Sequence, residues 1–436
     1  MNDTIFAPAT APGRAGIAVV RVSGASAKDA VIAVTGAQPP EPRLAALRAF
    51  RDFEGETIDE GLVLWFAGPA SFTGEDVVEF QLHGGRAIVE RVLATLGRLP
   101  RMRMAERGEF TRRAVENGKL DLTRAEAIAD LVDAETEAQR RQAFRQYEGG
   151  LYQMAEGWRG RLIKALAWAE AAIDFAEDEV PAEAWAEVEA AIRELYQEIQ
   201  RLMDDGRRGE ILREGVHITV IGPPNAGKSS FINALARRDV AIVSPIPGTT
   251  RDIVEARLDL GGYPVIVADT AGIRETDEII EAEGVRRART RSTQGDLTVL
   301  VLDGSLADPA AGLDPELVEG AALTLLNKSD LPWAGAHEGH RLSLTTGDGL
   351  APAVSALTEL VRNRIGTRDG VALTRERHRR AVSAAAEHLK RAETAGSPEL
   401  ISEDLRLALR AIGELTGRVD VEDLLDVVFR DFCIGK

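Results

Sequence analysis

The sequence predicts a multidomain protein of α/β and all-α parts, in which a P-loop domain with a doubly wound, mostly parallel sheet is inserted into a helical domain. Three observations support this fold class. The chain has 436 residues, enough for about three domains of roughly 150 residues. Strands and helices alternate from residue 211 to about residue 365, and Ala-, Leu-, Glu- and Arg-rich helical sequence stands on both sides of that segment. An α+β domain is expected before the first helical part.

Composition and charge narrow the functional class. Hydrophobic residues make up 44% of the chain and charged residues 28%, which is typical of folded protein and not of disorder. The net charge of −17 excludes a generic polyanion binder, so any contact with nucleic acid needs a local basic patch, a partner or a bound state. A single cysteine, Cys433, excludes an intrachain disulfide and favours a reducing compartment. Neither a signal peptide nor a membrane-spanning stretch is evident, so the cytoplasm is the expected location.

The first 118 residues mix short apolar runs with Gly and Pro turns. IAVVRV, LVLWFA and VVEFQL have the length and composition of strands. From residue 119 the sequence becomes helical, with apolar residues at helical spacing through LTRAEAIADLVDAETEAQRRQAF and AEAWAEVEAAIRELYQEIQRLM.

A polar break at 204–209 ends the first helical part. The strands HITVIG, VIVADT, LTVLVLD and ALTLLNK then alternate with helical segments, as in a parallel sheet. Helical sequence returns at Arg375 and is expected to continue to the end of the chain. The predicted domains are 1–118 (α+β), 119–210 (helical, first part), 211–368 (inserted α/β domain) and 369–436 (helical, second part).

A phosphate-binding loop lies between the first strand of the inserted domain and the helix that follows. GPPNAGKS, from Gly222 to Ser229, fits G-x-x-x-x-G-K-[ST] in this context. Glycines let backbone N–H groups surround phosphate oxygens, and the helix N-terminus favours their negative charge. Lys228 is expected to reach the β- and γ-phosphates and Ser229 to bind Mg²⁺.

Three further elements follow in the order of a GTP-binding domain. PGTTRD supplies Thr250 for the Mg²⁺ shell, and DTAG supplies Asp269 as a metal partner through water. NKSD ends in Asp330, which would accept two hydrogen bonds from guanine. Adenine would leave that carboxylate unpaired at a cost of about 1–3 kcal/mol, so GTP is favoured over ATP. The residues predicted to bind the nucleotide are Asn225, Ala226, Gly227, Lys228, Ser229, Ser230, Ser244, Thr249, Thr250, Asp269, Thr270, Ala271, Gly272, Asn327, Lys328 and Asp330.

Ile273 follows DTAG where small signalling GTPases have a water-orienting glutamine, so either hydrolysis is very slow or another polar group positions the water. An aliphatic side chain cannot position the attacking water. Glu281 is one candidate among the acidic residues that follow, although these acids fit a solvated helix face equally well. Arg251 and Arg274 lie in the two switch segments, but exposed solubilising arginines explain them at least as well as an arginine finger.

Taken together, these motifs resemble the MnmE (TrmE) family of tRNA-modification GTPases over nearly the whole chain. The resemblance rests on APATAPGRAGIAVVRVSG, SFTGEDVVEFQLHGG, NGKLDLTRAEAIADLVDA, GPPNAGKSS, AIVSPIPGTTRD, DTAGIRET and the C-terminal FCIGK. It implies a cytoplasmic homodimer that, with an MnmG-type flavoprotein in a heterotetramer, modifies C5 of the wobble uridine (U34) of tRNA to a carboxymethylaminomethyl-type group.

The resemblance also implies a folate cofactor, 5-formyl- or 5,10-methylene-tetrahydrofolate, bound by the N-terminal domain, which would also carry dimerisation. The matching positions are Arg21, Glu79, Lys119 and Lys436. Arg21 and the lysines suit the folate carboxylates, and Glu79 suits a pterin N–H and amino group. Without the resemblance, each would be an ordinary surface charge.

Finally, the resemblance implies that the G domains dimerise across their nucleotide faces with K⁺ in place of an arginine finger. The implied K⁺ positions are Asn225, Ser244, Ile246 and Thr249, where carbonyl oxygens can replace the water of a monovalent cation. Glu281 matches the family's water-orienting acid, so the implied catalytic residues are Glu281, Lys228 and Thr250. The base-flanking element is matched only weakly, by Ser343-Leu344-Thr345.

Other readings remain open. A ribosome-assembly GTPase switch would share the GTP-binding motifs, although no KH-like loop follows the G domain. A folate-binding scaffold with a vestigial GTPase is disfavoured by the intact motifs. Cys433 is more simply a small buried residue of a C-terminal helix than a reactive thiolate. Five arginines fit either tRNA phosphate contacts or solvated surface: Arg101, Arg103, Arg107, Arg112 and Arg113.

Overall fold

The computed structural model divides into two compact units, which are described separately. The first comprises 1–129, 152–159 and 409–436, and the second comprises 130–151 and 160–408. The residues that the structure describes are 3–174, 182–237, 255–269, 295–334, 337–366, 370–419, 425, 428–429 and 432–435. At 174, 182–184, 255 and 268–269 the description covers the backbone alone.

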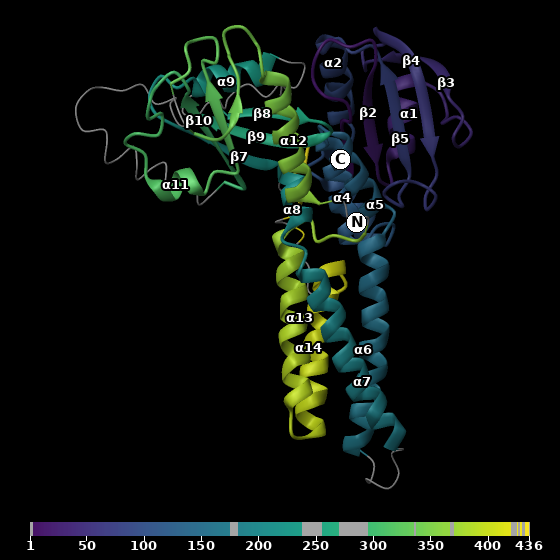
Figure 1. The fold of residues 1–436 in the computed structure, drawn as a ribbon. Helices are drawn as coiled ribbons and strands as arrows, with labels where there is room; N and C mark the ends of the chain where they lie inside the picture. The colour runs from purple at the N-terminus through teal and green to yellow at the C-terminus, as the bar shows by residue number, and fades with distance from the viewer. Residues whose placement is uncertain are drawn as a thin grey trace, which may run out of the picture. The chain divides into compact units, whose positions relative to one another are not determined.

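A six-stranded sheet of order β3-β4-β5-β2-β1-β6 forms the centre of the first unit (Figure 1). Its neighbouring strands pair antiparallel, apart from β1 and β6, which are parallel. The strands are β1 Thr4–Pro8, β2 Ala18–Ser23, β3 Ala46–Arg51, β4 Thr57–Phe66, β5 Val77–Leu82 and β6 Met102–Met104. Three of them, β2, β4 and β5, are the runs that sequence patterning predicts.

Side chains along β2 alternate between the two faces of this sheet. Val20 and Val22 are buried in the core under helices α1 (Ala27–Thr35) and α2 (Arg86–Gly97). Side chains of a strand alternate between faces, so Arg21 lies on the opposite face, with its partner residue on β5. The sequence pattern thus sends a charged side chain to the face that α1 and α2 do not cover.

The helical sequence that follows is divided into three helices. It forms α3 (Glu109–Glu116), α4 (Leu122–Asp133) and α5 (Glu137–Tyr147). Before α5, the Thr136 side chain accepts a hydrogen bond from the Gln139 backbone N–H, and the Gln139 side chain caps the Thr136 N–H in return. This capping box starts a new helix where sequence periodicity alone suggested a continuous one.

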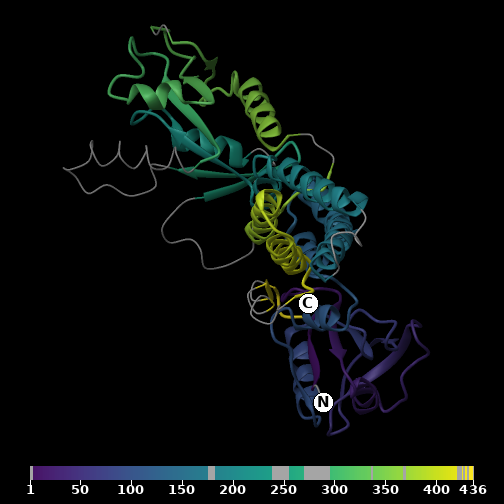
Figure 2. The same cartoon turned by 90° about the horizontal axis from the view of Figure 1, so that it is seen from below.

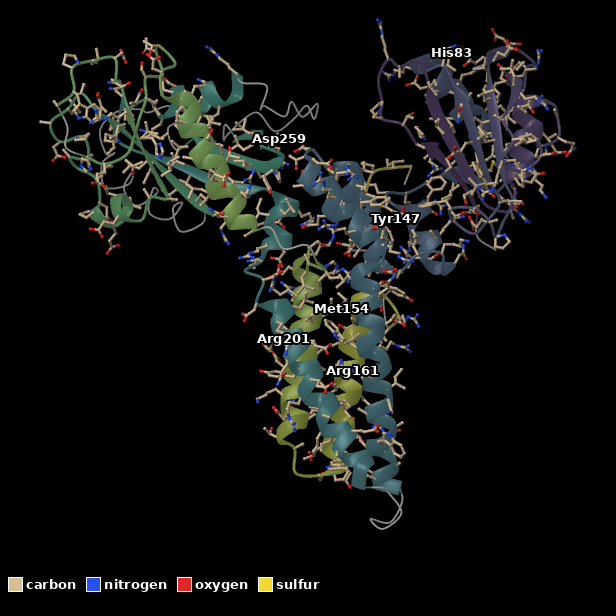
Figure 3. The ribbon with its side chains drawn as sticks, turned by 45° about the vertical axis from the view of Figure 1, so that its right-hand side comes forward. His83, Tyr147, Met154, Arg161, Arg201 and Asp259 are labelled. Carbon is tan, nitrogen blue, oxygen red and sulfur yellow. The ribbon has the colours of Figure 1, made fainter. Side chains whose placement is uncertain are left out.

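Four long helices, most of whose residues belong to the second unit, lie side by side, as Figures 1 and 2 both show. Arg161 on α6 contacts Glu198 on α7 at 2.7 Å, and Arg406 on α14 contacts Glu170 on α6 at the same distance. Figure 3 labels Arg161 among the side chains of these helices. The helices are α6 Gly150–Asp174, α7 Ala182–Met203, α13 Glu376–Thr394 and α14 Pro398–Thr416. Every helix of the described part is too short or too polar to cross a bilayer.

The inserted domain has the predicted doubly wound, mostly parallel sheet, in the order β12-β11-β10-β7-β9-β8. Only the edge strand β8 is antiparallel to its neighbour. The strands are β7 Val216–Ile221, β8 Glu255–Leu260, β9 Tyr263–Asp269, β10 Leu297–Asp303, β11 Leu323–Asn327 and β12 His340–Arg341. The helices are α8 Arg208–Glu214, α9 Lys228–Leu235, α11 Pro315–Glu319 and α12 Leu350–Ile365.

Parallel strands with apolar side chains on both faces build the core of this domain. Val220, Val299 and Leu325, on the adjacent strands β7, β10 and β11, are fully buried, and Phe231 of α9 and Leu357 of α12 pack into the same cluster. The carboxyl ends of parallel strands meet at one edge, where ligands of such sheets bind. The phosphate-binding loop follows β7 at this edge, NKSD begins at the last residue of β11, and Asp269 is the last residue of β9.

Candidate functional site

A tight turn joins β7 to α9 and forms the phosphate-binding loop. Gly222, Asn225 and Gly227 all have positive φ, at 146°, 59° and 108°. These conformations turn the chain back on itself before α9 begins at Lys228. A helix N-terminus is a favourable place for phosphate oxygens, because the helix dipole and the first N–H groups attract negative charge.

The Lys228 ammonium group lies across the mouth of this loop. It donates hydrogen bonds to the carbonyl oxygens of Gly222 and Pro223, at 2.9 and 2.8 Å. These contacts hold the ammonium charge beside the backbone that would surround the phosphates. Ser229 and Ser230 follow in the first turn of α9, and both are exposed. The loop therefore combines a fixed cation with accessible hydroxyl groups.

Glycine is required at two positions of the loop because other groups lie against it. A Cβ at Gly222 would lie 2.0 Å from the carbonyl oxygen of Val301 on β10. A Cβ at Gly227 would lie 2.3 Å from Nδ2 of Asn327. The spacing of the two glycines in the motif is thus explained by packing as well as by φ.

Asn327 connects the phosphate-binding loop with the base-binding motif. Its side-chain amide donates to the carbonyl of the fully buried Ala226 at 2.8 Å. Its Oδ1 accepts a hydrogen bond of 3.1 Å from the backbone N–H of Leu344. The sequence predicted Asn327 as a nucleotide-binding residue; the described contacts give it a bridging role between two loops.

Leu344 belongs to a compact turn that sequence motifs had matched only weakly. Ser343 is buried, and its hydroxyl oxygen accepts hydrogen bonds from the N–H groups of Thr345 and Thr346. This turn lies directly beside NKSD because of the Asn327 contact. The Ser343 hydroxyl was the available sequence signal, since serine readily caps such turns.

Lys328 adopts the left-handed conformation, with φ of 65°, and its ammonium contacts Asp303 at 2.6 Å. Burial alone would raise the pKa of Asp303, but hydrogen bonds from Lys328 and Ser305 outweigh it, so its pKa is below the usual value. Asp303 was not predicted as a site residue, although it ends the strand LTVLVLD. Asp330, the predicted guanine partner, is exposed two positions after Lys328.

Several predicted residues lie outside the part that the structure describes. Asp269 is placed by its backbone at the end of β9, where it pairs with Val220 on β7 just before the phosphate-binding loop. The predicted site residues outside the described ranges are Ser244, Ile246, Thr249, Thr250, Thr270, Ala271, Gly272, Glu281 and Lys436. The same holds for Arg251, Ile273 and Arg274.

In the N-terminal sheet, two of the predicted folate-binding residues bind each other. Arg21 and Glu79 are direct partners across β2 and β5, and their side chains form an ion pair of 2.8 Å. The Arg21 guanidinium lies 5.7 Å from the Phe72 ring and 5.8 Å from the Phe110 ring. Both charged side chains stay partly accessible, at 23% and 19%. Lys119 donates instead to the carbonyl of Pro69 at 2.9 Å.

The C-terminal tail lies against the same sheet. The Gly108 N–H donates to the Cys433 carbonyl at 3.3 Å, and Ile434 forms a β-bridge with Arg107. A Cβ at Gly435 would lie 2.0 Å from the carbonyl oxygen of Pro8. Pro8 follows Ala7, the residue of β1 that pairs with Arg21 on β2. The expectation that helix continues to the end of the chain is therefore wrong, because Ile434 is in extended conformation and forms a β-bridge with Arg107.

Exposure of Cys433 corrects the interpretation of this residue. Its side chain is exposed, whereas the sequence favoured a buried position in a helix. The extended bridge explains the difference, since it directs Phe432 into the core with Phe429 and leaves the next side chain outside.

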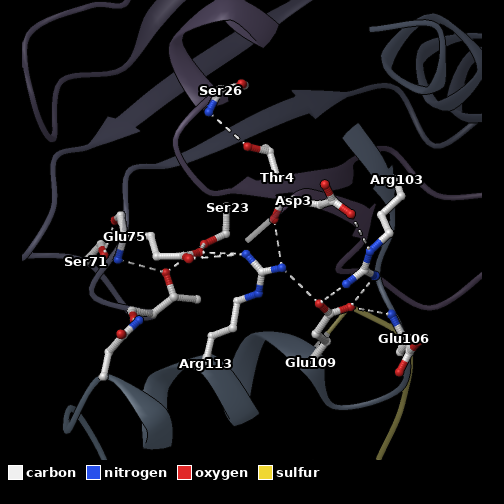
Figure 4. Close-up of polar contacts among 12 residues, drawn as sticks. Asp3, Thr4, Ser23, Ser26, Ser71, Glu75, Arg103, Glu106, Glu109 and Arg113 are labelled. Atoms are coloured by element: carbon white, nitrogen blue, oxygen red, sulfur yellow. Dashed lines mark hydrogen bonds and ion pairs between the residues drawn. The ribbon is translucent and has the colours of Figure 1, made fainter. Parts of the chain in front are cut away.

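Buried ion pairs account for part of the arginine cluster (Figure 4). Arg113 is 5% exposed and binds Glu75 and Glu109, at 3.1 and 2.9 Å. Arg103 binds the same Glu109 at 2.6 Å. Burial alone would raise the pKa of Glu109, but hydrogen bonds from Arg103, the Glu106 N–H and Arg113 outweigh it, so its pKa is lowered. Arg113 thus has a structural role.

Comparisons with known proteins agree over the whole chain. The family model for the "GTP-binding protein TrmE N-terminus" matches residues 4–119, and that for the "MnmE helical domain" matches residues 122–433. The chain is 51% identical to the tRNA modification GTPase MnmE of Paramagnetospirillum magneticum, with 100% of both chains covered. It is 52% identical to the protein of that name from Parvibaculum lavamentivorans, again over 100% of both chains.

Solved structures include the G domain of the T. maritima FeoB iron transporter, which is 23% identical, covers 35% of this chain and 99% of that one, and has a TM-score of 0.25. Family models that together match most of the chain, and relatives of about 50% identity over the full length, decide the assignment. The chain belongs to the MnmE family of tRNA-modification GTPases.

Proposed function

We propose that this protein hydrolyses GTP to drive carboxymethylaminomethyl-type modification at C5 of the wobble uridine (U34) of tRNA. GTP hydrolysis in tRNA modification is the activity of the family. The observation that carries the nucleotide part is the contact network of Asn327, which joins the phosphate-binding loop, NKSD and the 343–348 turn. A single amide thereby holds the phosphate-binding and base-binding loops in one arrangement.

Guanine recognition is assigned to Asp330, and phosphate binding to Lys228 and the N–H groups at the start of α9. The exposed Ser229 suits Mg²⁺, with Thr250 as a second ligand and Asp269 acting through water. The metal would stabilise negative charge that develops on the phosphates. Asp330 is exposed and lies three residues after the end of β11, in the NKSD segment that contacts the 343–348 turn. This exposure favours access of a base.

Potassium is proposed to supply the remaining positive charge. Asn225 has a left-handed backbone and an exposed side chain in the phosphate-binding loop. An oxygen ligand there would face a second G domain in a homodimer, with Ser244, Ile246 and Thr249 as further ligands. Glu281 is proposed to orient the attacking water, because Ile273 cannot do so.

Folate binding is assigned to the N-terminal domain, residues 1–118. The other proposed domains are the helical parts 119–210 and 369–436 and, between them in sequence, the G domain 211–368. The partly accessible Arg21–Glu79 pair, flanked by two aromatic rings, supports this location. A pterin that binds Glu79 would release Arg21 for a carboxylate of 5-formyl- or 5,10-methylene-tetrahydrofolate. Lys119 and Lys436 are proposed to hold further carboxylate oxygens. In the cytoplasm, an MnmG-type flavoprotein would complete a heterotetramer with the homodimer.

GTP hydrolysis in KCl and in NaCl, at equal ionic strength, tests the mechanism. Faster turnover in KCl is expected, because the loop carbonyls and Asn225 would replace the water of K⁺ more readily than that of Na⁺. Equal rates would remove the cation mechanism and favour a GTPase that acts only as a binding switch. Loss of the wobble modification from tRNA of a deletion strain tests the biological assignment separately.

A further inference from the structure

Helix α5 carries an unusual pair of exposed aromatic side chains on its solvent face. Phe144 is 44% exposed and Tyr147 is 39% exposed, and their ring centroids are 6.3 Å apart at an interplanar angle of 39°. Val132, on the neighbouring end of α4, is 46% exposed. Tyr147 is labelled in Figure 3, at the C-terminal end of this helix.

The opposite face of α5 explains why the rings point outward. Ala143 and Gln146 are buried, and the Gln142 side chain donates to the Gly209 carbonyl at 2.9 Å. The helix is therefore anchored through its inner face. Phe144 and Tyr147 are left on the outer face, where burial in the core does not explain them.

Three arginines lie on the same helix as the two rings. Arg140 and Arg141 are 53% and 65% exposed, and Arg145 lies one position beyond Phe144. Arg140 donates to both oxygens of Glu137 at 2.8 Å, and Arg141 donates to the same carboxylate at 2.7 Å. A guanidinium has five N–H donors, so each of these two retains donors for a further acceptor.

Glu137 holds the two guanidinium groups side by side. Hydrogen bonds from Arg140 and then Arg141 lower its pKa to about 2, so the carboxylate remains charged under physiological conditions. The segment 137–148 holds three arginines against two glutamates, in a chain with a net charge of −17. This segment thus carries two exposed aromatic rings and a net charge of +1, although the exposed Asp133 and Glu135 lie just before it.

We infer that the outer face of α5 binds unpaired nucleotides of the tRNA substrate, with Phe144 and Tyr147 stacking on bases and the arginines contacting phosphates. The inference rests on the proposed function, which supplies the tRNA. Aromatic rings beside arginines are the usual means of binding single-stranded RNA without sequence preference. Eleven helical residues span about 16 Å, a length that accommodates only a few nucleotides.

Anisotropy of a fluorescently labelled tRNA transcript with uridine at the wobble position tests the inference on the full-length protein. Phe144→Ala/Tyr147→Ala should weaken binding about tenfold or more, since neither ring remains to stack on a base. Phe144→Tyr/Tyr147→Phe, which keeps both rings, should bind tRNA as tightly as the wild type. Phe53→Ala is the matched control, because Phe53 is a 51% exposed ring beside Arg98 and belongs to the other unit.

A salt series adds a readout that a purely structural role would not change. Arg141→Gln should reduce the slope of log affinity against log salt by about 0.7 to 1, because one phosphate is no longer neutralised by a guanidinium. GTP turnover without RNA should remain at the wild-type rate in all of these variants, which shows that they are folded.

Each contrary outcome has its own meaning. Equal tRNA affinity of the double alanine variant and the wild type would overturn the inference and leave the proposed function intact. If the double alanine variant keeps wild-type tRNA affinity but no longer co-elutes with the flavoprotein partner, this face is a protein-docking surface instead. Absence of measurable tRNA affinity in the wild-type protein would also overturn the inference about α5. The proposed function is tested independently, by the wobble modification in cells.

Discussion

The side-chain amide of Asn327 donates a hydrogen bond of 2.8 Å to the carbonyl of Ala226, which lies 101 residues earlier in the chain. Ala226 is fully buried, so its carbonyl has no access to water in place of this donor. The contact gives the phosphate-binding loop a fixed position relative to NKSD. Both halves of the nucleotide site consequently depend on one side chain.

Asn327→Ala should lower GDP affinity and stability together. It removes the donor to Ala226 and the acceptor of the Leu344 N–H, and an unsatisfied buried polar group costs about 1–3 kcal/mol. Nucleotide fluorescence titration and urea unfolding measure the two effects. Ser329→Ala, at the exposed position two residues along, should leave both unchanged. Full GDP affinity in Asn327→Ala would contradict the bridging role.

Gly227→Ala should abolish tight nucleotide binding. The added Cβ would lie 2.3 Å from Asn327 Nδ2, and φ of 108° is strained for alanine, at about 1–3 kcal/mol. Gly157→Ala is the control, because this glycine lies within α6 with open space around it. That change should stabilise the protein by about 0.5–1 kcal/mol. Thermal unfolding with and without GDP distinguishes the two, and a tightly binding Gly227→Ala protein would refute the packing argument.

Glu109 should make the stability of the N-terminal unit depend on acidic pH. Its pKa in the folded state lies below the ordinary value of 4.5, so the folded state favours the ionised carboxylate. The stabilisation is present above that value and is lost as the pH falls through it toward the lowered pKa. Glu109→Gln should therefore be less stable at pH 7, by about 1–3 kcal/mol.

The same variant should lose less stability than the wild type between about pH 6 and about pH 3, measured by urea unfolding at each pH. Glu90→Gln is the control, because Glu90 pairs with Arg86 at the surface, where both side chains are mostly exposed. Parallel pH profiles of Glu109→Gln and the wild type would show that another group is responsible.

Glu281→Ala should abolish GTP hydrolysis and spare GTP affinity. A residue that orients water contributes to the chemical step and not to binding of the ground state. Single-turnover hydrolysis and nucleotide titration measure the two quantities. Glu283→Ala, two positions along the same acidic segment, should behave like the wild type. Wild-type turnover in Glu281→Ala would exclude the water-orienting role.

Local patterns in the sequence were sufficient for the doubly wound sheet and the phosphate-binding loop. Buried parallel strands need continuous apolar runs, and phosphate binding needs glycines at fixed positions, so β7, β10 and β11 were readable directly. The interruption between α4 and α5 was missed. Helical periodicity continues through it, and the break depends on the Thr136–Gln139 capping box.

Tertiary structure decided the contacts between residues far apart in the chain. Arg21 and Glu79 were each readable as a charged residue on a strand, yet only the register of β2 and β5 makes them an ion pair. Cys433 was assigned to a buried helix, because a short tail carries no periodicity to reveal a bridge with Arg107–Gly108. Sequence by itself determined which chemical groups this protein has for GTP. Folding determined which of them meet, because contacts over long separations depend on strand register and packing that no local pattern encodes.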